Sequence, residues 1–542
     1  MSKLAAYLRG HLAGEVVTRD DIRDALSNDG GVLSLRPEMV IYPRNTNDIR
    51  KVLRFSWQLA EKGHILPVTA RGGGTDTTGA AVGKGISLVT TAHMNQIYEY
   101  DAKQKLVRLQ PGVTSVALDS ALNLQGTSLH MLADAPIVST VGGAIADATA
   151  GRYAGKYGAI DRAVEQLEVV LANGDVIQTG RINKRELSRR KGLQSFEGDI
   201  YRGIDGIIEE YGDVLDRLAA NDAVGYNTIA DVKLKDGSFD LTPLFVGSQG
   251  TLGVISEMIL RSEFRSSNAA VGALVFETAE MARDALDQLY AMHPAFVEYF
   301  DATLFNKAAA QGCNFEWYTQ VAAQFTPSSV VIVGFDDFNS HHREKSLKRI
   351  QKAYGKRDDV GLVMADAEKA PDILAALDVA AYTQLPDHKD VVSPAVFGGF
   401  FVPTARLEDF MNAIDALAKQ DHVELPLSGH AMTNTYSLHP SLELHKVSDK
   451  QRLFKLLDDL TKLVYEHGGT MVAEGGEGRL KARSIYAQLD ERVVAMYAAI
   501  RTVCDPFGTL NPGVKQPVDV RELVSMLHTE SKVAPLVQLS LP

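Results

Sequence analysis

Cysteine is scarce in this sequence. Only Cys313 and Cys504 occur among 542 residues, and no CxxC pair is present. The chain therefore lacks ligands for an iron–sulfur cluster or a cysteine-based zinc site, and it cannot build a disulfide framework. These absences favour a reduced, cytoplasmic setting.

Long apolar runs are absent too. No stretch approaches the about 18 consecutive apolar residues that a membrane span requires. Near the start, Lys3, Arg9, His11 and Glu15 interrupt the chain before an apolar run reaches the length of a signal peptide. We expect no export signal and no transmembrane segment. Peripheral contact with the inner face of a membrane is still compatible with the sequence.

Positive charge is in deficit. The sequence has 56 lysines and arginines against 68 aspartates and glutamates, a formal net charge of −12. Such a chain repels phosphate backbones, so nucleic acid is not an expected partner. The composition does not fix an oligomeric state, and a homodimer is compatible with it.

Two styles of pattern are present along the chain. Short β-rich runs alternate with glycine-rich turns from about residue 33 to 264, with a helical pattern at 46–63. Longer amphipathic helices follow, at 277–292 and 407–420, with strand-like runs between them. A chain this long exceeds one usual hydrophobic core. We predict an α+β protein with four parts: an N-terminal helical segment 1–32, an α+β domain 33–263, an α/β cap domain 264–515 and a C-terminal appendage 516–542.

Two glycine-rich stretches, 71–83 and 139–158, carry the strongest local signal. Glycines bring backbone N–H groups close to a ligand, and a concavity of such groups binds phosphates. Taken alone, the first stretch is equally compatible with an ordinary surface loop. Neither stretch has the GxGxxG spacing of a Rossmann fold or the GK[ST] of a Walker loop. A nicotinamide-dependent enzyme is therefore disfavoured, and another nucleotide-binding scaffold is needed.

Several ordered motifs resemble the vanillyl-alcohol oxidase superfamily, whose FAD-binding domain is called PCMH-type. The nearest members are the D-lactate, glycolate and D-2-hydroxyglutarate dehydrogenases. The resemblance is carried by the segments 66–83, 107–114, 133–177 and 244–260, and by CDPFGTLNPGVK at 504–515. It implies FAD held between two α+β subdomains, plus a C-terminal substrate (cap) domain. Thr75 and Asp76 stand where relatives with covalent flavin often carry histidine, which implies non-covalent FAD.

The resemblance also implies which residues bind the cofactor. The pyrophosphate would lie over the backbone of residues 71–75, and the second loop would complete the site. The implied cofactor-binding residues are Arg71, Gly72, Gly73, Gly74, Thr75, Asp76, Gly79, Pro136, Ser139, Thr140, Gly142, Gly143, Gly151, Gly158, Val254, Ile255 and Asn511. One departure from the family pattern lies close by: Gln249 stands where glutamate is common.

In the resembling dehydrogenases, an HxGDGNxH motif and an EHG motif supply ligands for a divalent metal beside the substrate. The matching segments here are 429–440 and 473–481, in which His430 and Glu474 are retained. Ser437 and Gly475 replace the two other histidines. Two protein ligands are too few for a typical zinc site, so the sequence leaves a metal in doubt. His439, two residues beyond the expected position, is the only substitute ligand we identify.

His430, Glu474 and Lys481 are the predicted catalytic residues. His430 would act as general base, Glu474 would orient it, and Lys481 would bind the substrate carboxylate. Plainer alternatives are a structural histidine at a strand end, a Glu474–Arg479 ion pair and a solvated lysine. Other cations considered for the substrate are Lys389, Arg406, Arg479 and Arg483.

These residues predict an FAD-dependent dehydrogenase or oxidase acting on CH–OH donors. The small-molecule substrate would be a secondary alcohol, such as the D-2-hydroxy acid D-lactate, which passes hydride to the flavin. The sequence leaves the electron acceptor open among oxygen, a quinone and an electron-transfer protein. A flavin-binding protein with a degenerate cap, acting in sensing or partner binding, is the alternative from another class.

Overall fold

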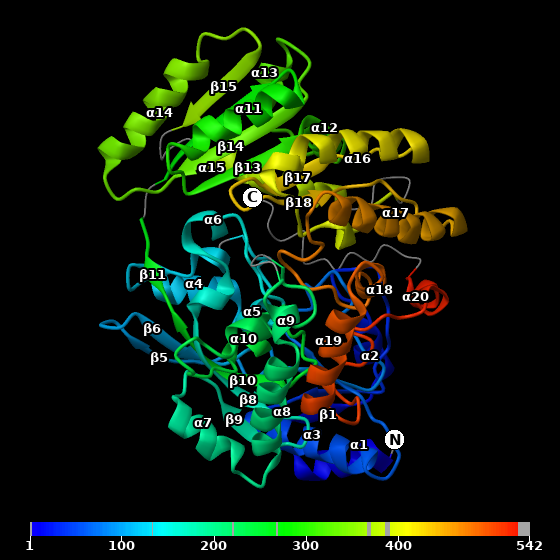
Figure 1. Ribbon diagram of the computed structural model, residues 1–542. Coiled ribbons are helices and arrows are strands. Elements are labelled where there is room, and N and C mark those ends of the chain that lie inside the picture. The colour runs from blue at the N-terminus through cyan, green and yellow to red at the C-terminus, as the bar shows by residue number, and fades with distance from the viewer. Residues whose placement is uncertain are drawn as a thin grey trace.

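The structure is a computed structural model, and it describes residues 3–132, 134–218, 222–266, 269–365, 370–384 and 391–528. Figure 1 shows two bodies, one above the other. The lower body contains the N-terminal half of the chain and the last helices, coloured red. The upper body contains the segment coloured from green to orange.

The lower body begins with a four-stranded sheet of order β1-β2-β4-β3, in which β2, β4 and β3 run parallel. Asn45 caps α3 by accepting a hydrogen bond from Asp48 N, and Ile49 and Val52 of that helix are buried. The elements are α1 Lys3–His11, β1 Glu15–Val17, α2 Asp20–Ala25, β2 Met39–Tyr42, α3 Thr46–Ala60, β3 Val68–Arg71 and β4 Ile86–Val89. The first glycine-rich loop leaves directly from the end of β3.

A five-stranded antiparallel sheet of order β5-β6-β10-β8-β9 completes the lower body. Its strands are β5 Ile97–Asp101, β6 Leu106–Leu109, β8 Val164–Val170, β9 Val176–Gln178 and β10 Val254–Arg261. A separate pair joins β7 Thr127–Ser128 to β11 Glu263–Phe264. The helices here are α4 Ser115–Asn123, α5 Val141–Ala146, α6 Ala154–Tyr157, α7 Lys184–Lys191, α8 Phe196–Glu210, α9 Gly212–Leu215 and α10 Thr242–Phe245.

The upper body is a seven-stranded antiparallel sheet of order β15-β12-β14-β13-β17-β18-β16 between two layers of helices. Alternate residues of β12 enter two separate cores, Leu274 with α11 and α14, and Val275 with α12 and α13. The strands are β12 Ala270–Phe276, β13 Phe296–Asp301, β14 Ser329–Phe335, β15 Val360–Ala365, β16 Phe400–Phe401, β17 Leu427–His430 and β18 Thr435–Leu438. The helices are α11 Ala279–Tyr290, α12 Ala302–Ala310, α13 Glu316–Ala322, α14 Ser340–Tyr354, α15 Ala370–Leu374, α16 Leu407–Asp421 and α17 Val447–Glu466.

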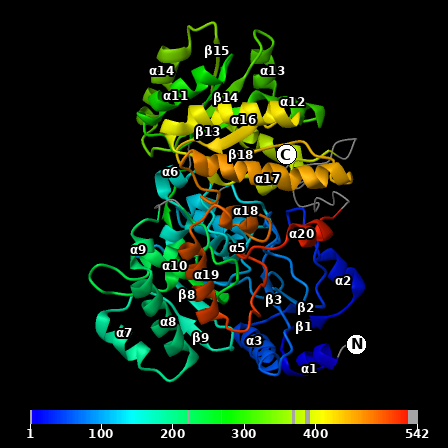
Figure 2. The ribbon, with the colours of Figure 1, turned by 45° about the vertical axis from the view of Figure 1, so that its right-hand side comes forward.

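The chain then returns to the lower body through α18 Ala482–Tyr486, α19 Glu491–Cys504 and α20 Val520–Met526. Helix α19 packs against α8 (Figure 2). Beyond it, Val68 N donates to Thr509 O at 2.8 Å, and Asn511 N donates to Val68 O at 2.9 Å. The predicted cap segment 264–515 therefore contributes its last residues to the lower body, beside β3.

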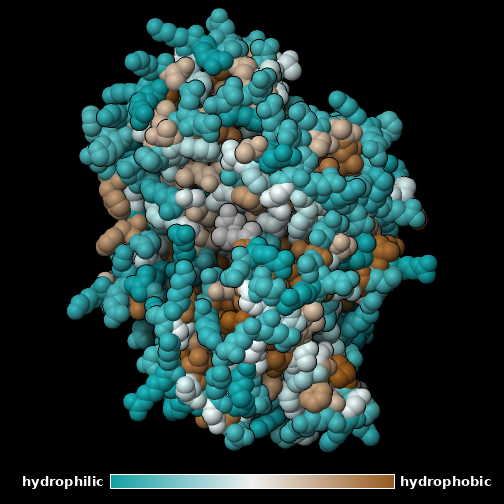
Figure 3. All heavy atoms as spheres, in the orientation of Figure 1, coloured by the Kyte–Doolittle hydropathy of each residue, from teal (hydrophilic) through white to brown (hydrophobic). Residues whose placement is uncertain are grey.

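The surface seen in Figure 3 is mainly hydrophilic, as the composition implies. Among the described residues, no helix is both long and apolar enough to cross a bilayer.

Candidate active site

A cavity of about 430 Å³ lies where the two bodies meet. Its lower wall comes from both glycine-rich loops and from residues 248–255, and its upper wall from the end of β17 and residues 395–399 and 474–481. Of the predicted site residues, those lining it are Arg71, Gly72, Gly73, Gly74, Thr75, Asp76, Pro136, Ser139, Thr140, Gly142, Gly143, Gly151, Val254, Ile255, His430, Glu474 and Lys481.

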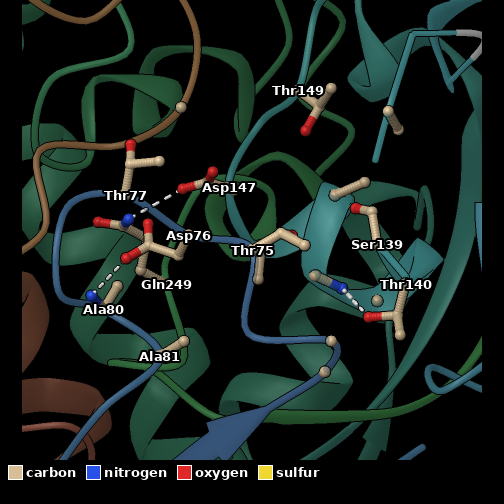
Figure 4. A pocket seen from close by; sticks show the side chains of 18 of the residues that line it. Thr75, Asp76, Thr77, Ala80, Ala81, Ser139, Thr140, Asp147, Thr149 and Gln249 are labelled. Atoms are coloured by element: carbon tan, nitrogen blue, oxygen red, sulfur yellow. Dashed lines mark hydrogen bonds between the residues drawn. The ribbon is translucent and has the colours of Figure 1, made fainter. Parts of the chain in front are cut away.

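The two glycine-rich loops meet backbone to backbone. A Cβ atom on Gly73 would lie 1.9 Å from Val138 O, and one on Gly72 would lie 2.0 Å from Thr140 Oγ1. Only glycine fits at such distances. Thr140 also caps α5 by accepting a hydrogen bond from Gly143 N at 3.2 Å (Figure 4). The loops thus form one continuous wall of exposed backbone.

The first loop is held from within by Asp76 and Arg71. The Asp76 carboxylate accepts a hydrogen bond from Ala80 N at 2.7 Å (Figure 4). It also accepts hydrogen bonds from Thr78 N and Oγ1 at 3.0 and 2.8 Å. Arg71 is 7 % exposed and donates to Ala81 O and to Asn28 O. Burial lowers the pKa of Arg71, although nearby carboxylates act in the opposite direction. Both side chains therefore shape the loop as well as line the cavity.

Three predicted cofactor-binding residues do not line the cavity. Gly79 has φ +83 and packs beside Leu33, while Gly158 has φ +85 at the end of α6. Asn511 is fully buried and joins separate segments: its Nδ2 donates to Ala80 O at 2.8 Å and to Gln249 O at 2.9 Å. These positions support the walls, and any contact with a cofactor at them stays a prediction.

His430 lies at the end of β17, in register with Glu298 of β13. Its Nδ1 is 2.9 and 2.8 Å from the two Glu298 carboxylate oxygens, and its Nε2 is 3.6 Å from Glu474 Oε1. Burial lowers the pKa of His430, but the charges of Glu298 and Glu474 outweigh burial and raise it to about 10. The imidazole therefore carries a proton at neutral pH. His430 is therefore a cation between two carboxylates, and an imidazole that is already protonated does not accept a further proton.

Sequence reasoning did not identify Glu298. It occupies a buried strand position at 3 % exposure, and burial raises the pKa of its carboxyl while His430 opposes that shift. A glutamate within the apolar run of β13 was the available signal, because a buried carboxylate needs a partner. That partner is 132 residues away in the sequence.

Glu474 links the cap to the second glycine-rich loop. Its Oε2 accepts a hydrogen bond from Gly151 N at 3.1 Å. It does not pair with Arg479, the plainer alternative considered above. Arg479 instead donates to Val82 O, Pro512 O and Asn511 Oδ1. Glu474 is therefore held beside His430 while it still lines the cavity.

Lys481 is buried at 2 % exposure, and its Nζ donates to Gly398 O at 2.6 Å. Burial lowers the pKa of Lys481 to about 8, although Asp147 and other carboxylates act against that shift. Of the other cations considered, Arg483 pairs with Asp458 and Arg406 lies near Asp409 at the start of α16. Lys389 lies outside the described residues. Among those of these cations that the structure describes, only Lys481 lines the cavity.

The residues here do not fit the divalent metal of the resembling dehydrogenases. Ser437 and Gly475 line the cavity at the two substituted positions, and both ring nitrogens of His430 face carboxylates. The buried His439 instead has Nε2 2.8 Å from Ser428 Oγ and is not in the cavity wall. Burial lowers its pKa to about 4. Within the described part of the chain, no three His, Cys, Asp or Glu side chains are placed to hold a metal.

Two family models match the chain: the FAD binding domain over residues 37–180, and the C-terminal domain of the FAD linked oxidases over residues 265–514. The chain belongs to the FAD-linked oxidases. This membership confirms the predicted superfamily, FAD as the cofactor and enzymatic activity. The coarse activity is that of an FAD-linked oxidoreductase of the D-lactate, glycolate and 2-hydroxyglutarate dehydrogenase group.

Curated relatives of this FAD-linked oxidase are only distantly similar. The glycolate oxidase subunit GlcD of Bacillus subtilis is 25% identical over 90% of this chain and 91% of its own length. The D-lactate dehydrogenase of Archaeoglobus fulgidus is 25% identical over 88% of this chain and 90% of its own. The D-2-hydroxyglutarate dehydrogenase of Escherichia coli is 23% identical over 92% of this chain. The chain spans only 50% of that relative's length.

Solved structures confirm the predicted fold class. p-Cresol methylhydroxylase superposes with a TM-score of 0.69 at 14% identity, covering 96% of this chain and 97% of that one. An alkyldihydroxyacetonephosphate synthase superposes with a TM-score of 0.64 at 15% identity, covering 94% and 86%. The FAD-linked oxidase therefore has the expected α+β architecture, with a PCMH-type FAD-binding domain and a cap.

The cavity wall is compatible with a flavin nucleotide. Gly72, Gly73 and Gly74 present bare backbone where any Cβ atom would collide with a neighbour. The cavity volume lies in the range usual for ligand pockets. We propose that the predicted cofactor-binding residues in this wall hold FAD, with the two loops beside its pyrophosphate.

Proposed function

We propose that this FAD-linked oxidase oxidises a D-2-hydroxy acid such as D-lactate at its CH–OH group. FAD would supply the hydride acceptor, and the protein would supply orientation and charge. The observation that supports this most is that His430, Glu474 and Lys481 line the same cavity as both glycine-rich loops. A hydroxy acid needs a carboxylate anchor and a proton acceptor, and the cavity offers cations and a carboxylate.

The proposed roles follow from charge. The His430 imidazolium stabilises negative charge on the substrate oxygens, because Glu298 and Glu474 keep it protonated. Glu474 accepts the hydroxyl proton, since its Oε1 is 3.6 Å from His430 Nε2 and it lines the cavity. Lys481 binds the substrate carboxylate. The base role predicted for His430 alone is thereby assigned to the His430–Glu474 pair.

Anaerobic reduction of the bound flavin tests the proposal. D-lactate, glycolate and D-2-hydroxyglutarate are each mixed with the FAD-loaded protein, with and without zinc or manganese. At least one should bleach the flavin absorbance, and the metal should change the rate little. Absence of bleaching by every hydroxy acid tested would contradict the proposal and favour the flavin-binding alternative.

A substitution tests the residues. His430→Gln should lower the rate of flavin reduction at least about a hundredfold, the usual cost of removing a positioned group that stabilises developing negative charge. The flavin absorbance of the variant should match that of the wild type. Lys481→Met should chiefly raise KM, since it removes the proposed anchor. Unchanged turnover in His430→Gln would contradict the assigned site.

The partner that reoxidises the flavin belongs to the same proposal. We expect oxygen, a quinone or a soluble electron-transfer protein to act in a cytoplasmic setting. Steady-state rates with oxygen, a short-chain quinone and an artificial dye distinguish these acceptors. Sedimentation of the FAD-loaded protein tests the homodimer.

A further inference from the structure

Asp147 lines the cavity but has no role in the function proposed above. It caps the C-terminal end of α5, the helix of the second glycine-rich loop. Its Oδ1 accepts a hydrogen bond from Gln249 Nε2 at 2.9 Å (Figure 4). The hydrogen bond from Gln249 therefore fixes Oδ1, and with it the direction of Oδ2.

Gln249 is itself tightly fixed. Its backbone has φ +51, with N donating to Ala146 O at 2.8 Å. Its side-chain Oε1 accepts from Gly478 N at 2.9 Å, so the amide oxygen and nitrogen cannot exchange places. The NH2 group must therefore face Asp147 and Thr78 Oγ1, as Figure 4 shows for Asp147. A glutamate at this position would have no proton to donate when ionised.

The second oxygen of Asp147 lies beside Gly475, and both residues line the cavity. Gly475 has φ +57, and apart from its chain neighbours, a Cβ atom built on it would meet only Asp147 Oδ2, at 3.6 Å, among the atoms of the described residues within 4 Å. This is the position at which the resembling dehydrogenases carry a metal-binding histidine. In this chain, Asp147 Oδ2 lies next to the position of that missing histidine side chain, and Lys481 lines the same cavity.

The charges around Asp147 favour its protonated form. Burial raises the pKa of Asp147 to about 8, and the negative charge of Asp76 acts in the same direction. The Gln249 hydrogen bond and the positive charges of Lys481 and Lys515 oppose the shift. Because Gln249 donates to Oδ1, a proton on the carboxyl belongs on Oδ2.

We propose that Asp147, positioned by Gln249, donates a hydrogen bond from Oδ2 to the carboxylate of the substrate in the space at Gly475. With Lys481 it forms a two-point carboxylate anchor. This inference rests on the proposed hydroxy-acid function and names the anchor that selects an acidic substrate. Gln249 is a positioning residue, because it acts through Asp147.

Two variants separate donor from acceptor without changing side-chain shape. In Asp147→Asn, the amide oxygen accepts from Gln249 Nε2, so the NH2 group faces Gly475 and remains a donor. In Gln249→Glu/Asp147→Asn, the new carboxylate attracts that NH2 group, and the amide oxygen turns toward Gly475 as an acceptor. Asp161→Asn, at an exposed position of the short 3-10 helix Ile160–Ala163, is the matched control. All rates are expressed per bound FAD.

The expected results differ for the two variants. Asp147→Asn should keep KM for D-lactate within about threefold of the wild type. The double variant should raise KM about ten- to a hundredfold, the usual cost of losing a hydrogen bond to a charged group, while kcat changes less. KM of the wild type should rise as pH increases through about 8, because an ionised Asp147 repels the substrate carboxylate and Lys481 loses its charge in the same range. Asp147→Asn should reduce that rise to the part due to Lys481.

Three outcomes would overturn the inference. If both variants keep the wild-type KM, the Asp147–Gln249 pair is only structural. If Asp147→Asn loses affinity and the double variant keeps it, Asp147 is an acceptor. If KM rises with pH as steeply in Asp147→Asn as in the wild type, Asp147 does not titrate beside the substrate.

Binding measured without turnover keeps this inference separate from the proposed function. The unfolding temperature of each FAD-loaded variant is recorded with D-lactate and with its oxidation product, pyruvate. If these acids stabilise the wild type but no hydroxy acid of the panel bleaches the flavin, the proposed function fails and the comparison of variants still decides the anchor. If no acid of the panel binds or reacts, both proposals fail.

Discussion

At the scale of single residues, His430 determines a pH dependence of stability. Its pKa in the folded protein is raised to about 10, above the value of about 6.5 for an unfolded chain. The folded state then binds more protons between these values, so this contribution is complete below about pH 6.5 and is lost toward pH 10. We expect the unfolding temperature to fall over this range, and to fall less in His430→Gln. Calorimetry of the FAD-loaded protein measures both slopes.

If the unfolding temperature falls with pH equally steeply in His430→Gln and in the wild type, His430 is not protonated as described.

Asp147 adds a decline of the same sign, because its raised pKa also makes the folded state bind more protons, here between about pH 4 and about pH 8. The two contributions overlap between about pH 6.5 and pH 8 and separate outside it: Asp147→Asn should flatten the curve from about pH 4 to pH 8, and His430→Gln from about pH 6.5 to pH 10.

His430 and Glu474 were predicted from sequence because their motifs are local. The charge of His430 was not predictable in this way, because it depends on Glu298, which reaches it only when β13 pairs with β17. Asp147 was missed for a similar reason: its environment is made by Gln249 and by the segment that contains Lys481. Residue identity follows from motifs, whereas a pKa depends on tertiary contacts.

At the scale of elements, the two glycine-rich loops can be tested through Gly73. Gly73→Ala places a Cβ atom 1.9 Å from Val138 O, a backbone atom that cannot move without displacing the second loop. We expect this variant to lose FAD binding and about 1–3 kcal/mol of stability. FAD content after purification and urea unfolding are the measurements.

The matched control is Gly206→Ala on α8, where a Cβ atom meets nothing within 4 Å. Because alanine favours a helix over glycine, this control should gain up to about 1 kcal/mol and keep its FAD. Normal FAD content in Gly73→Ala would mean that the loops do not meet as described.

The elements themselves were predictable where the pattern is local. The helical pattern at 46–63 corresponds to α3, Thr46–Ala60, and the pattern at 407–420 to α16, Leu407–Asp421. The order of the strands in the cap was not predictable. It places β13 between β14 and β17, and the pairing of β13 with β17 joins segments that lie more than a hundred residues apart in the sequence, from Glu298 to His430.

At the scale of the whole molecule, a buried ion pair joins the C-terminal segment to the cavity wall. Lys515 Nζ lies 2.7 Å from Glu477 Oε2, and both side chains are fully buried. Lys515→Met leaves Glu477 without its partner, so we expect a loss of about 3–5 kcal/mol. Glu477→Gln in the same chain should recover part of that loss. Denaturant unfolding of the FAD-loaded protein measures both.

Lys84 and Glu522 form the comparison, because they lie 3.9 Å apart with both side chains exposed. Lys84→Met should change stability by less than about 1 kcal/mol. A similarly small effect for Lys515→Met would show that the buried pair does not hold the segment in place.

The hydrogen bonds of Val68 and Asn511 have a consequence for biosynthesis. The strand that leads into the first glycine-rich loop is made early, yet its partner, Thr509, emerges from the ribosome some four hundred residues later. Asn511 then closes on Ala80 and Gln249 at once. The wall that we propose for FAD is thus completed only after residue 511 has been synthesised, and a nascent chain halted before Thr509 lacks these hydrogen bonds.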